Sequence, residues 1–326
     1  MLMCASSSAA RPAGTAICWG WDFAGECTPP AGHKFVKVSA GHRFTLGINA
    51  QGQIIHWGST YHGRGDVPSG NIFVDVSAGY DHGLALDAVG NVYAWGGGDP
   101  DAGGDLGQGT QGDTGEHTYT AIAAGEAFSL ALRSNGTIAH WGRNWEQQHL
   151  IPDNDANAPG FSPYVAIDAG GHHGIGLKAN GSVRVWGAVN YQSCTTQGVL
   201  PSFPGETHFI AIGAGHYTSY AIRSDRSVEW WGCTGCNPAQ QNTMAPPSTF
   251  QPDDETSPAS VDAGYHHALG RTTQGRVVAW GGPCALGGGT VVFDYPNTVP
   301  SFLSEATVLS IGTGHSNAHN VIIIMD

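Results

Sequence analysis

The chain has 326 residues and a formal charge of −13; 49 residues are Gly and only 12% are charged. This glycine content excludes a mainly helical protein, and an aromatic content of 10% excludes a disordered one. An acidic balance without a basic patch argues against nucleic-acid partners, and the sequence has no run of about 18 apolar residues that would predict a membrane span.

The first 14 residues, MLMCASSSAARPAG, lack the charged start and the apolar run of a complete signal peptide. We expect residues 1–14 to be a flexible tail or the remnant of a leader. Residues 15–326 are expected to form a single domain, because one pattern recurs through all of them.

The pattern is anchored by a glycine and a later Trp-Gly pair. The glycines end short apolar segments and are Gly41, Gly79, Gly125, Gly170, Gly215, Gly264 and Gly314. Sixteen residues after each of the first six stand Trp57, Trp95, Trp141, Trp186, Trp231 and Trp280. Trp19 has no such glycine before it, and Gly314 has no such tryptophan after it. The chain is therefore a sevenfold repeat that is cut within one unit.

Each unit predicts three antiparallel strands. In the first unit, "FVKVSAG" leads through two variable residues to "FTLGI", a glycine hairpin and "QIIHWG". Such a unit cannot bury both of its faces alone, but seven units arranged radially can. The sequence thus predicts an all-β, seven-bladed β-propeller. We expect residues 15–20 to complete the last blade beside residues 318–325, which would cover an exposed strand edge.

The repeat resembles that of the regulator of chromosome condensation family in its bacterial form. The linkers "WGWDFAGECTPP" and "WGGGDPDAGGDLGQG" match that family's pattern as well as the strands do. The resemblance covers residues 15–326 and implies a seven-bladed propeller, similar to the propeller-type β-lactamase inhibitor proteins. It leaves the function open, because one scaffold hosts unrelated activities.

Three histidines stand three residues after their repeat glycine, namely His82, His173 and His267. Other repeats carry Phe44, Phe128, Thr218 and Asn317 at this position. A residue that recurs by repeat position is expected to be structural. We expect these histidines to hydrogen-bond the turn between the inner strands.

One face of the propeller is the candidate binding face. The two variable residues after each glycine lie at the same end of the strands as the loops after Trp-Gly, because the hairpin between them reverses the chain once. The opposite, hairpin end is expected to be small and polar. The tryptophan that we expect to be exposed for binding is Trp145, which lies outside the Trp-Gly register. The candidate binding residues are Tyr80, Asp81, Trp145, Tyr191, His216, Tyr217, Tyr265 and His266.

Two functions from different classes fit this face. The favoured one is a non-enzymatic, monomeric propeller that binds a protein and could inhibit an enzyme by covering it. The alternative is a metal-dependent lyase or hydrolase in which histidines of the mouth converge: His42, His172, His216, His266 and His315. A propeller mouth is wide and no HxH or HxxxH pair joins these residues, whereas zinc requires ligands at about 2.0–2.1 Å. No catalytic residue, metal ligand or cofactor is therefore assigned, and an ordinary polar surface stays open as a third reading.

Cysteines indicate the compartment. Apart from Cys4 they form an even set beside the Trp-Gly pairs, and the loops that carry them belong to successive blades. This pattern predicts a secreted, periplasmic or cell-surface protein with at least two disulfides of undetermined connectivity, whereas free thiols or a Cys-rich metal cluster are the alternatives. The six cysteines are Cys18, Cys27, Cys194, Cys233, Cys236 and Cys284.

Overall fold

The computed structural model describes residues 12–97, 107–109, 117–187, 200–203, 208–232, 245–248, 250, 252, 261–265, 267–281, 299–314 and 319–325. The regular structure in these ranges is β-strand, with two short 3-10 helices, η1 (Tyr61–Gly63) and η4 (Ser301–Leu303). None of the helices in this part of the chain has the length and apolar character needed to cross a membrane.

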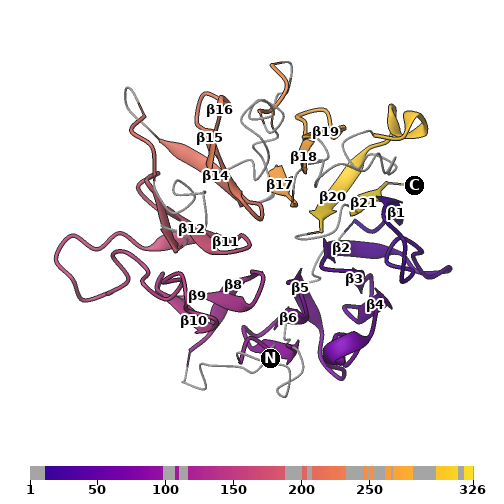
Figure 1. Ribbon diagram of the computed structural model, residues 1–326, viewed down its shortest axis with the longest axis horizontal. Coiled ribbons are helices and arrows are strands. Elements are labelled where there is room, and N and C mark those ends of the chain that lie inside the picture. The colour runs from indigo at the N-terminus through magenta and orange to yellow at the C-terminus, as the bar shows by residue number, and fades with distance from the viewer. Residues whose placement is uncertain are drawn as a thin grey trace, which may run out of the picture.

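The strands form seven three-stranded antiparallel sheets that radiate around a common centre, as Figure 1 shows. The first four blades are β2 (Phe35–Ala40), β3 (Phe44–Asn49) and β4 (Ile54–Gly58); β5 (Phe73–Ala78), β6 (His82–Asp87) and β7 (Val92–Gly96); β8 (Tyr119–Ala124), β9 (Phe128–Arg133) and β10 (Ile138–Gly142); β11 (Tyr164–Ala169), β12 (His173–Lys178) and β13 (Val183–Gly187). The last three are β14 (Phe209–Ala214), β15 (Thr218–Arg223) and β16 (Val228–Gly232); β17 (Val261–Ala263), β18 (His267–Arg271) and β19 (Val277–Gly281); β20 (Val308–Thr313), β21 (His319–Ile324) and β1 (Thr15–Gly20). The predicted seven-bladed propeller is confirmed.

The ring closes in blade 7, where the two ends of the domain meet. Strand β1 pairs antiparallel with β21, so that Trp19 lies opposite Asn320 and Thr15 opposite Ile324. The yellow β21 and the indigo β1 lie side by side in Figure 1. This closure by the N-terminal strand confirms the prediction and leaves no open edge on β21.

The core lies between neighbouring blades, and the tryptophans of the Trp-Gly pairs are its largest members. Six of them are at most 7% exposed, whereas Trp19 is partly buried. Glycines make room for the rings: a Cβ added at Gly83 would lie 2.3 Å from the Trp95 ring. The constant distance of sixteen residues from the repeat glycine to the tryptophan thus places each indole ring over the middle strand of its blade.

Buried histidines join one blade to the next. The Nε2 atoms of His82 and His173 lie 3.0 and 2.8 Å from the hydroxyls of Ser129 and Ser219, each on the following blade. His267 bonds Asn320 Oδ1 at 2.8 Å in the same way. The predicted structural role is confirmed. The bonds run to the middle strand of the neighbouring blade, where a bond to the turn between the inner strands was expected.

In blade 7 the residue at the repeat position of His82, His173 and His267 is not the one that the sequence analysis assigned. His319 lies opposite Gly20 across the sheet, as His82 lies opposite Gly96. Its Nε2 atom is 3.1 Å from Thr45 Oγ1 of blade 1. Counting three residues from Gly314 led to Asn317, which was wrong because blade 7 carries two additional residues before the strand.

Each of these histidines faces a residue on the middle strand of the next blade. That facing residue is polar only where the preceding blade carries a histidine. His82, His173, His267 and His319 meet Ser129, Ser219, Asn320 and Thr45, each one residue after the equivalent position of the next blade. After Phe44, Phe128 and Thr218, the corresponding residues are Gly83, Gly174 and Ala268. A buried imidazole requires a hydrogen-bond partner and a phenyl ring does not, which explains the correlation at the histidine and phenylalanine positions. Thr218, a buried hydroxyl, is the exception.

The centre of the ring is a cavity of about 210 Å³ lined by the innermost strand of every blade. Lys37 and Asp75 form an ion pair of 3.0 Å in its wall. Burial raises the pKa of Asp168 to about 6, and burial together with the charge of Asp168 raises that of Asp262 to about 7. Both carboxylates accept backbone N–H groups of the next blade, from Ala214 and Thr313. These acids therefore tie inner strands together at an electrostatic cost.

Cys18 and Cys27 form a disulfide with a Cα–Cα distance of 5.1 Å, which ties β1 to the loop that follows it. The other four candidates, Cys194, Cys233, Cys236 and Cys284, lie outside the described residues. One of the expected bonds is therefore confirmed, and a second stays a prediction.

Candidate binding face

The candidate binding face is the end of the propeller that carries the variable pairs and the loops after Trp-Gly. In blades 3, 4 and 5 the variable pairs bring three side chains together, which we call the Glu-His-His cluster: Glu126, His172 and His216. His172 Nε2 lies 3.2 Å from Glu126 Oε2, and His216 Nε2 lies 4.0 Å from the same oxygen. Both imidazoles are at most 4% exposed. Sequence reasoning placed all three near the mouth but counted only His216 as a site residue.

The electrostatics of the cluster follow from its burial. Burial raises the pKa of Glu126 to about 7, against the opposing effect of Arg143, whose guanidinium lies 3.8 Å from the carboxylate. Burial and the same guanidinium lower the pKa of His172. Arg143 also forms an ion pair with Glu146, so its charge is shared between two carboxylates.

Two tyrosines continue the cluster toward blade 6. The His216 ring lies 4.2 Å from the Tyr217 ring and 4.4 Å from the Tyr265 ring, measured between centroids. The two tyrosine hydroxyls are 3.1 Å apart and share a hydrogen bond. The structure thus brings together three of the predicted binding residues, and both tyrosines stay partly exposed at the mouth.

The predicted residues of blade 2 belong to a separate group. Tyr80 packs against His42 of blade 1 with ring centroids 4.0 Å apart and the two rings tilted by 49°. Asp81 forms an ion pair with Arg64, which is 4% exposed and donates to the carbonyl oxygen of His42 at 2.6 Å. Asp81 therefore serves first to hold the loop after β4 against blade 2.

Trp145 is 71% exposed, as predicted. The guanidinium of Arg143 lies 4.7 Å from its ring, a cation–π distance that restricts the indole without covering it. Trp145 therefore projects from the face with a fixed neighbour at its base.

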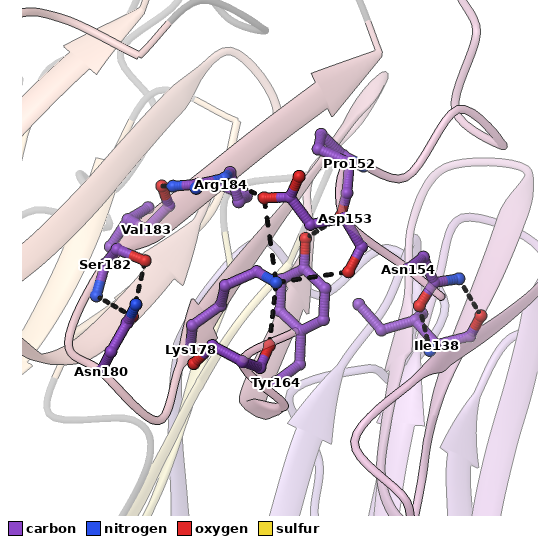
Figure 2. Close-up of polar contacts among 11 residues, drawn as sticks. Ile138, Pro152, Asp153, Asn154, Tyr164, Lys178, Asn180, Ser182, Val183 and Arg184 are labelled. Carbon is purple, nitrogen blue, oxygen red and sulfur yellow. Dashed lines mark hydrogen bonds and ion pairs between the residues drawn. The ribbon is translucent and has the colours of Figure 1, made fainter. Parts of the chain in front are cut away.

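The loop that carries Trp145 is fastened at its far end to blades 3 and 4, as Figure 2 shows. Asn154 bonds both backbone groups of Ile138, accepting from N at 2.7 Å and donating to O at 2.9 Å. Lys178 donates to the carbonyl of Asp153 at 3.3 Å and lies 4.5 Å from the Tyr164 ring, and Arg184 donates to the Asp153 carboxylate at 2.8 Å. These contacts anchor the loop on which the exposed indole is carried.

Two further aromatic side chains share the position of Trp145. Phe23, Tyr61 and Trp145 each stand three residues after the glycine of a Trp-Gly pair, and they are 71%, 75% and 71% exposed. We call these three residues the aromatic rim. The sequence analysis placed Tyr61 in a loop around the mouth but counted neither Phe23 nor Tyr61 among the candidate binding residues, although their shared repeat position was visible in the sequence.

The hairpin end is less polar than expected. Val89, in the turn between β6 and β7, is 72% exposed, and the adjacent Ile72 is 65% exposed. Their backbones are linked, since Ala88 N donates to Ile72 O at 2.9 Å. The expectation of a uniformly small and polar end was therefore wrong in blade 2. The remaining predicted binding residues, Tyr191 and His266, lie outside the described residues.

Comparison with known proteins gives a consistent picture. The sequence profile of the regulator of chromosome condensation (RCC1) repeat matches residues 73–99, 119–147 and 259–284. No curated protein sequence gives a significant match.

Solved structures share the architecture at low identity. Prp20p from Saccharomyces cerevisiae, described with its binding to Gsp1p and histones, has a TM-score of 0.70 at 17% identity over 98% of this chain and 92% of its own. Human WBSCR16 has a TM-score of 0.69 at 16% identity over 97% and 100%. The ectodomain of the Physcomitrella patens receptor kinase CR4 has a TM-score of 0.60 at 19% identity over 86% and 67%. Three segments of the chain thus match the RCC1 repeat, and the chain as a whole has the fold of a seven-bladed β-propeller.

Proposed function

We propose that this propeller is a non-enzymatic binding protein that holds a protein partner against the candidate binding face. The observation that carries the proposal is the aromatic rim, three large aromatic side chains exposed at one repeat position. Exposed aromatic surface costs solvation free energy unless something covers it, and such residues are the usual anchors of protein interfaces.

The rim is built for binding with little loss of entropy. Trp145 is held at its base by Arg143, and the far end of its loop is fastened by Asn154. An anchor that is already ordered gives up less conformational freedom on binding than a mobile one. Tyr217 and Tyr265 add a second aromatic group nearer the axis, with hydroxyls that can hydrogen-bond at an interface.

The charge and the fold support a protein as the partner. A formal charge of −13 disfavours nucleic acid and favours partners with a positive surface, since complementary charge speeds association. Prp20p, which has a similar fold, is described as binding Gsp1p and histones.

In its more specific form, the proposal is that the chain is secreted, periplasmic or displayed at the cell surface and acts by covering an enzyme. The Cys18–Cys27 disulfide supports the compartment, because such bonds persist where the environment is oxidising. The resemblance to propeller-type inhibitors supports the mode of action.

The test begins with affinity capture from the secreted fraction of the source organism, followed by binding measurements with the purified partner. Trp145→Ala and Tyr217→Ala should weaken the complex by about fivefold to a thousandfold, because truncating an interface anchor costs about 1–4 kcal/mol. Val89→Ala, which removes an exposed apolar side chain from the opposite end, is the matched control and should leave Kd unchanged. If Val89→Ala abolishes binding while both aromatic variants bind normally, the proposed face is wrong.

A further inference from the structure

Three blades each contribute one nitrogen or oxygen donor to a single point at the mouth of the propeller. From this geometry we propose that Glu126, His172 and His216 form a binding site for a divalent transition-metal ion of the zinc class. The donor atoms all lie within 4.8 Å of one another. Two imidazoles and one carboxylate are a ligand set that zinc takes in proteins, with a fourth position left for water or another ligand.

The distances are close to those that a metal requires. Tetrahedral ligands at about 2.0–2.1 Å from zinc lie about 3.3 Å from one another. The distance from His172 Nε2 to Glu126 Oε2, 3.2 Å, already matches, and His216 Nε2, at 4.0 Å from the same oxygen, must approach by about 0.7 Å. The shared oxygen is buried and accepts no hydrogen bond from the residues that the structure describes. A buried carboxylate oxygen that faces two imidazole nitrogens is a donor placed for a cation.

The orientation of His216 is set by its surroundings. A Cβ added at Gly171 would lie 2.6 Å from His216 Nδ1, so the imidazole occupies the space of a missing side chain. The rings of Tyr217 and Tyr265 flank it at 4.2 and 4.4 Å. With Nδ1 against Gly171, Nε2 is the atom directed at Glu126, and the small residue in blade 4 is what permits this arrangement.

The local charge also suits a cation. When Glu126 is ionised, Glu126 and Glu146 carry two negative charges, and Arg143, which contacts both, carries one positive charge. The guanidinium lies 3.8 Å from Glu126 Oε2, beyond hydrogen-bond distance, so it stabilises the carboxylate without occupying the donor position.

The sequence hid this site because each ligand comes from a different repeat. Zinc motifs recognised from sequence, such as HxxxH, place two ligands on one element. Here the ligands are 46 and 44 residues apart and meet only through the packing of blades 3, 4 and 5. His42 is not part of the cluster, since its ring packs against Tyr80 of blade 2.

The experiment uses the full chain stripped of metal with a chelator and then titrated with Zn²⁺ by calorimetry. One ion should bind per chain, and His172→Ala, His216→Ala and the isosteric Glu126→Gln should each weaken binding at least tenfold. His42→Ala, a histidine of the same mouth in another blade, should bind as the wild type does. Melting curves recorded in chelator show that every variant is folded, and Glu126→Gln keeps the test valid if a histidine variant is not.

Cobalt distinguishes this site from the cysteines. Co²⁺ bound by nitrogen and oxygen should give visible d–d absorption without a thiolate charge-transfer band. Absence of binding, binding that survives all three ligand variants, or a thiolate band would each overturn the proposal. Because zinc alone is the probe, the result does not depend on the proposed protein-binding function.

Discussion

Acid should weaken the propeller at the histidines that join its blades, and His267 is the clearest case. The ring is 1% exposed and bonds Asn320 of blade 7 at 2.8 Å. Burial lowers its pKa from 6.5 to about 4 in the folded protein. Its contribution to stability is therefore complete above pH 6.5 and is lost as the pH falls toward 4, because the unfolded chain binds a proton that the folded chain excludes.

The magnitude follows from the two pKa values. Each pH unit between 6.5 and 4 costs about 1.4 kcal/mol per histidine, so at pH 5 His267 alone costs about 2 kcal/mol. The wild-type curve does not isolate this effect, because Asp168 and Asp262 have raised pKa values and act in the opposite direction. The comparison must therefore be between wild type and His267→Gln.

The assay is urea unfolding of both proteins at pH 7 and pH 5. At pH 7, His267→Gln should be less stable than wild type by about 1–3 kcal/mol, because the bond to Asn320 is weakened in a buried site. At pH 5 that difference should shrink by about 2 kcal/mol, since the variant has no imidazole to protonate.

A control at the equivalent position separates titration from packing. Phe128→Leu alters the corresponding residue of blade 3, which is fully buried and has no ionisable group. The difference in the free energy of unfolding between Phe128→Leu and wild type should be the same at both pH values. If the difference in the free energy of unfolding between His267→Gln and wild type is also the same at both pH values, the reasoning is refuted.

Three further predictions concern the closure of the ring and its centre. Deleting residues 1–20 removes β1 and exposes the edge of β21, so the free energy of unfolding should fall by several kcal/mol, and an unchanged melting temperature would contradict the closure. Cys18→Ser should lower stability by about 2–4 kcal/mol by opening the short loop to Cys27; equal urea midpoints for variant and wild type would count against it. Asp262→Asn should stabilise the protein above pH 7, with a gain that fades toward pH 4, because the raised pKa of Asp262 shows that its charge is unfavourable in the folded state; a loss of stability at pH 8 would show the opposite.

Much of the fold could be predicted because its rules are local to one repeat. The segment from Gly41 to Trp57 contains a variable pair, a strand, a glycine hairpin and a second strand, and each is specified by its own composition. Seven copies of the repeat determine the number of blades. One of the units is split between the two ends of the domain, and this split determines the closure of β21 by β1. The exposure of Trp145 was also anticipated, because this residue stands in a loop outside the Trp-Gly register.

What the sequence could not determine lies between the blades. The partner of His82 is Ser129, in another repeat, and the shift to His319 in blade 7 appears only when the strands are paired. The meeting of Glu126, His172 and His216 depends on the spacing and tilt of three blades, and these follow from the packing of whole strands. Periodicity specifies which residues face the mouth of the propeller, whereas only the packing of each blade on the next decides which of them come within contact distance.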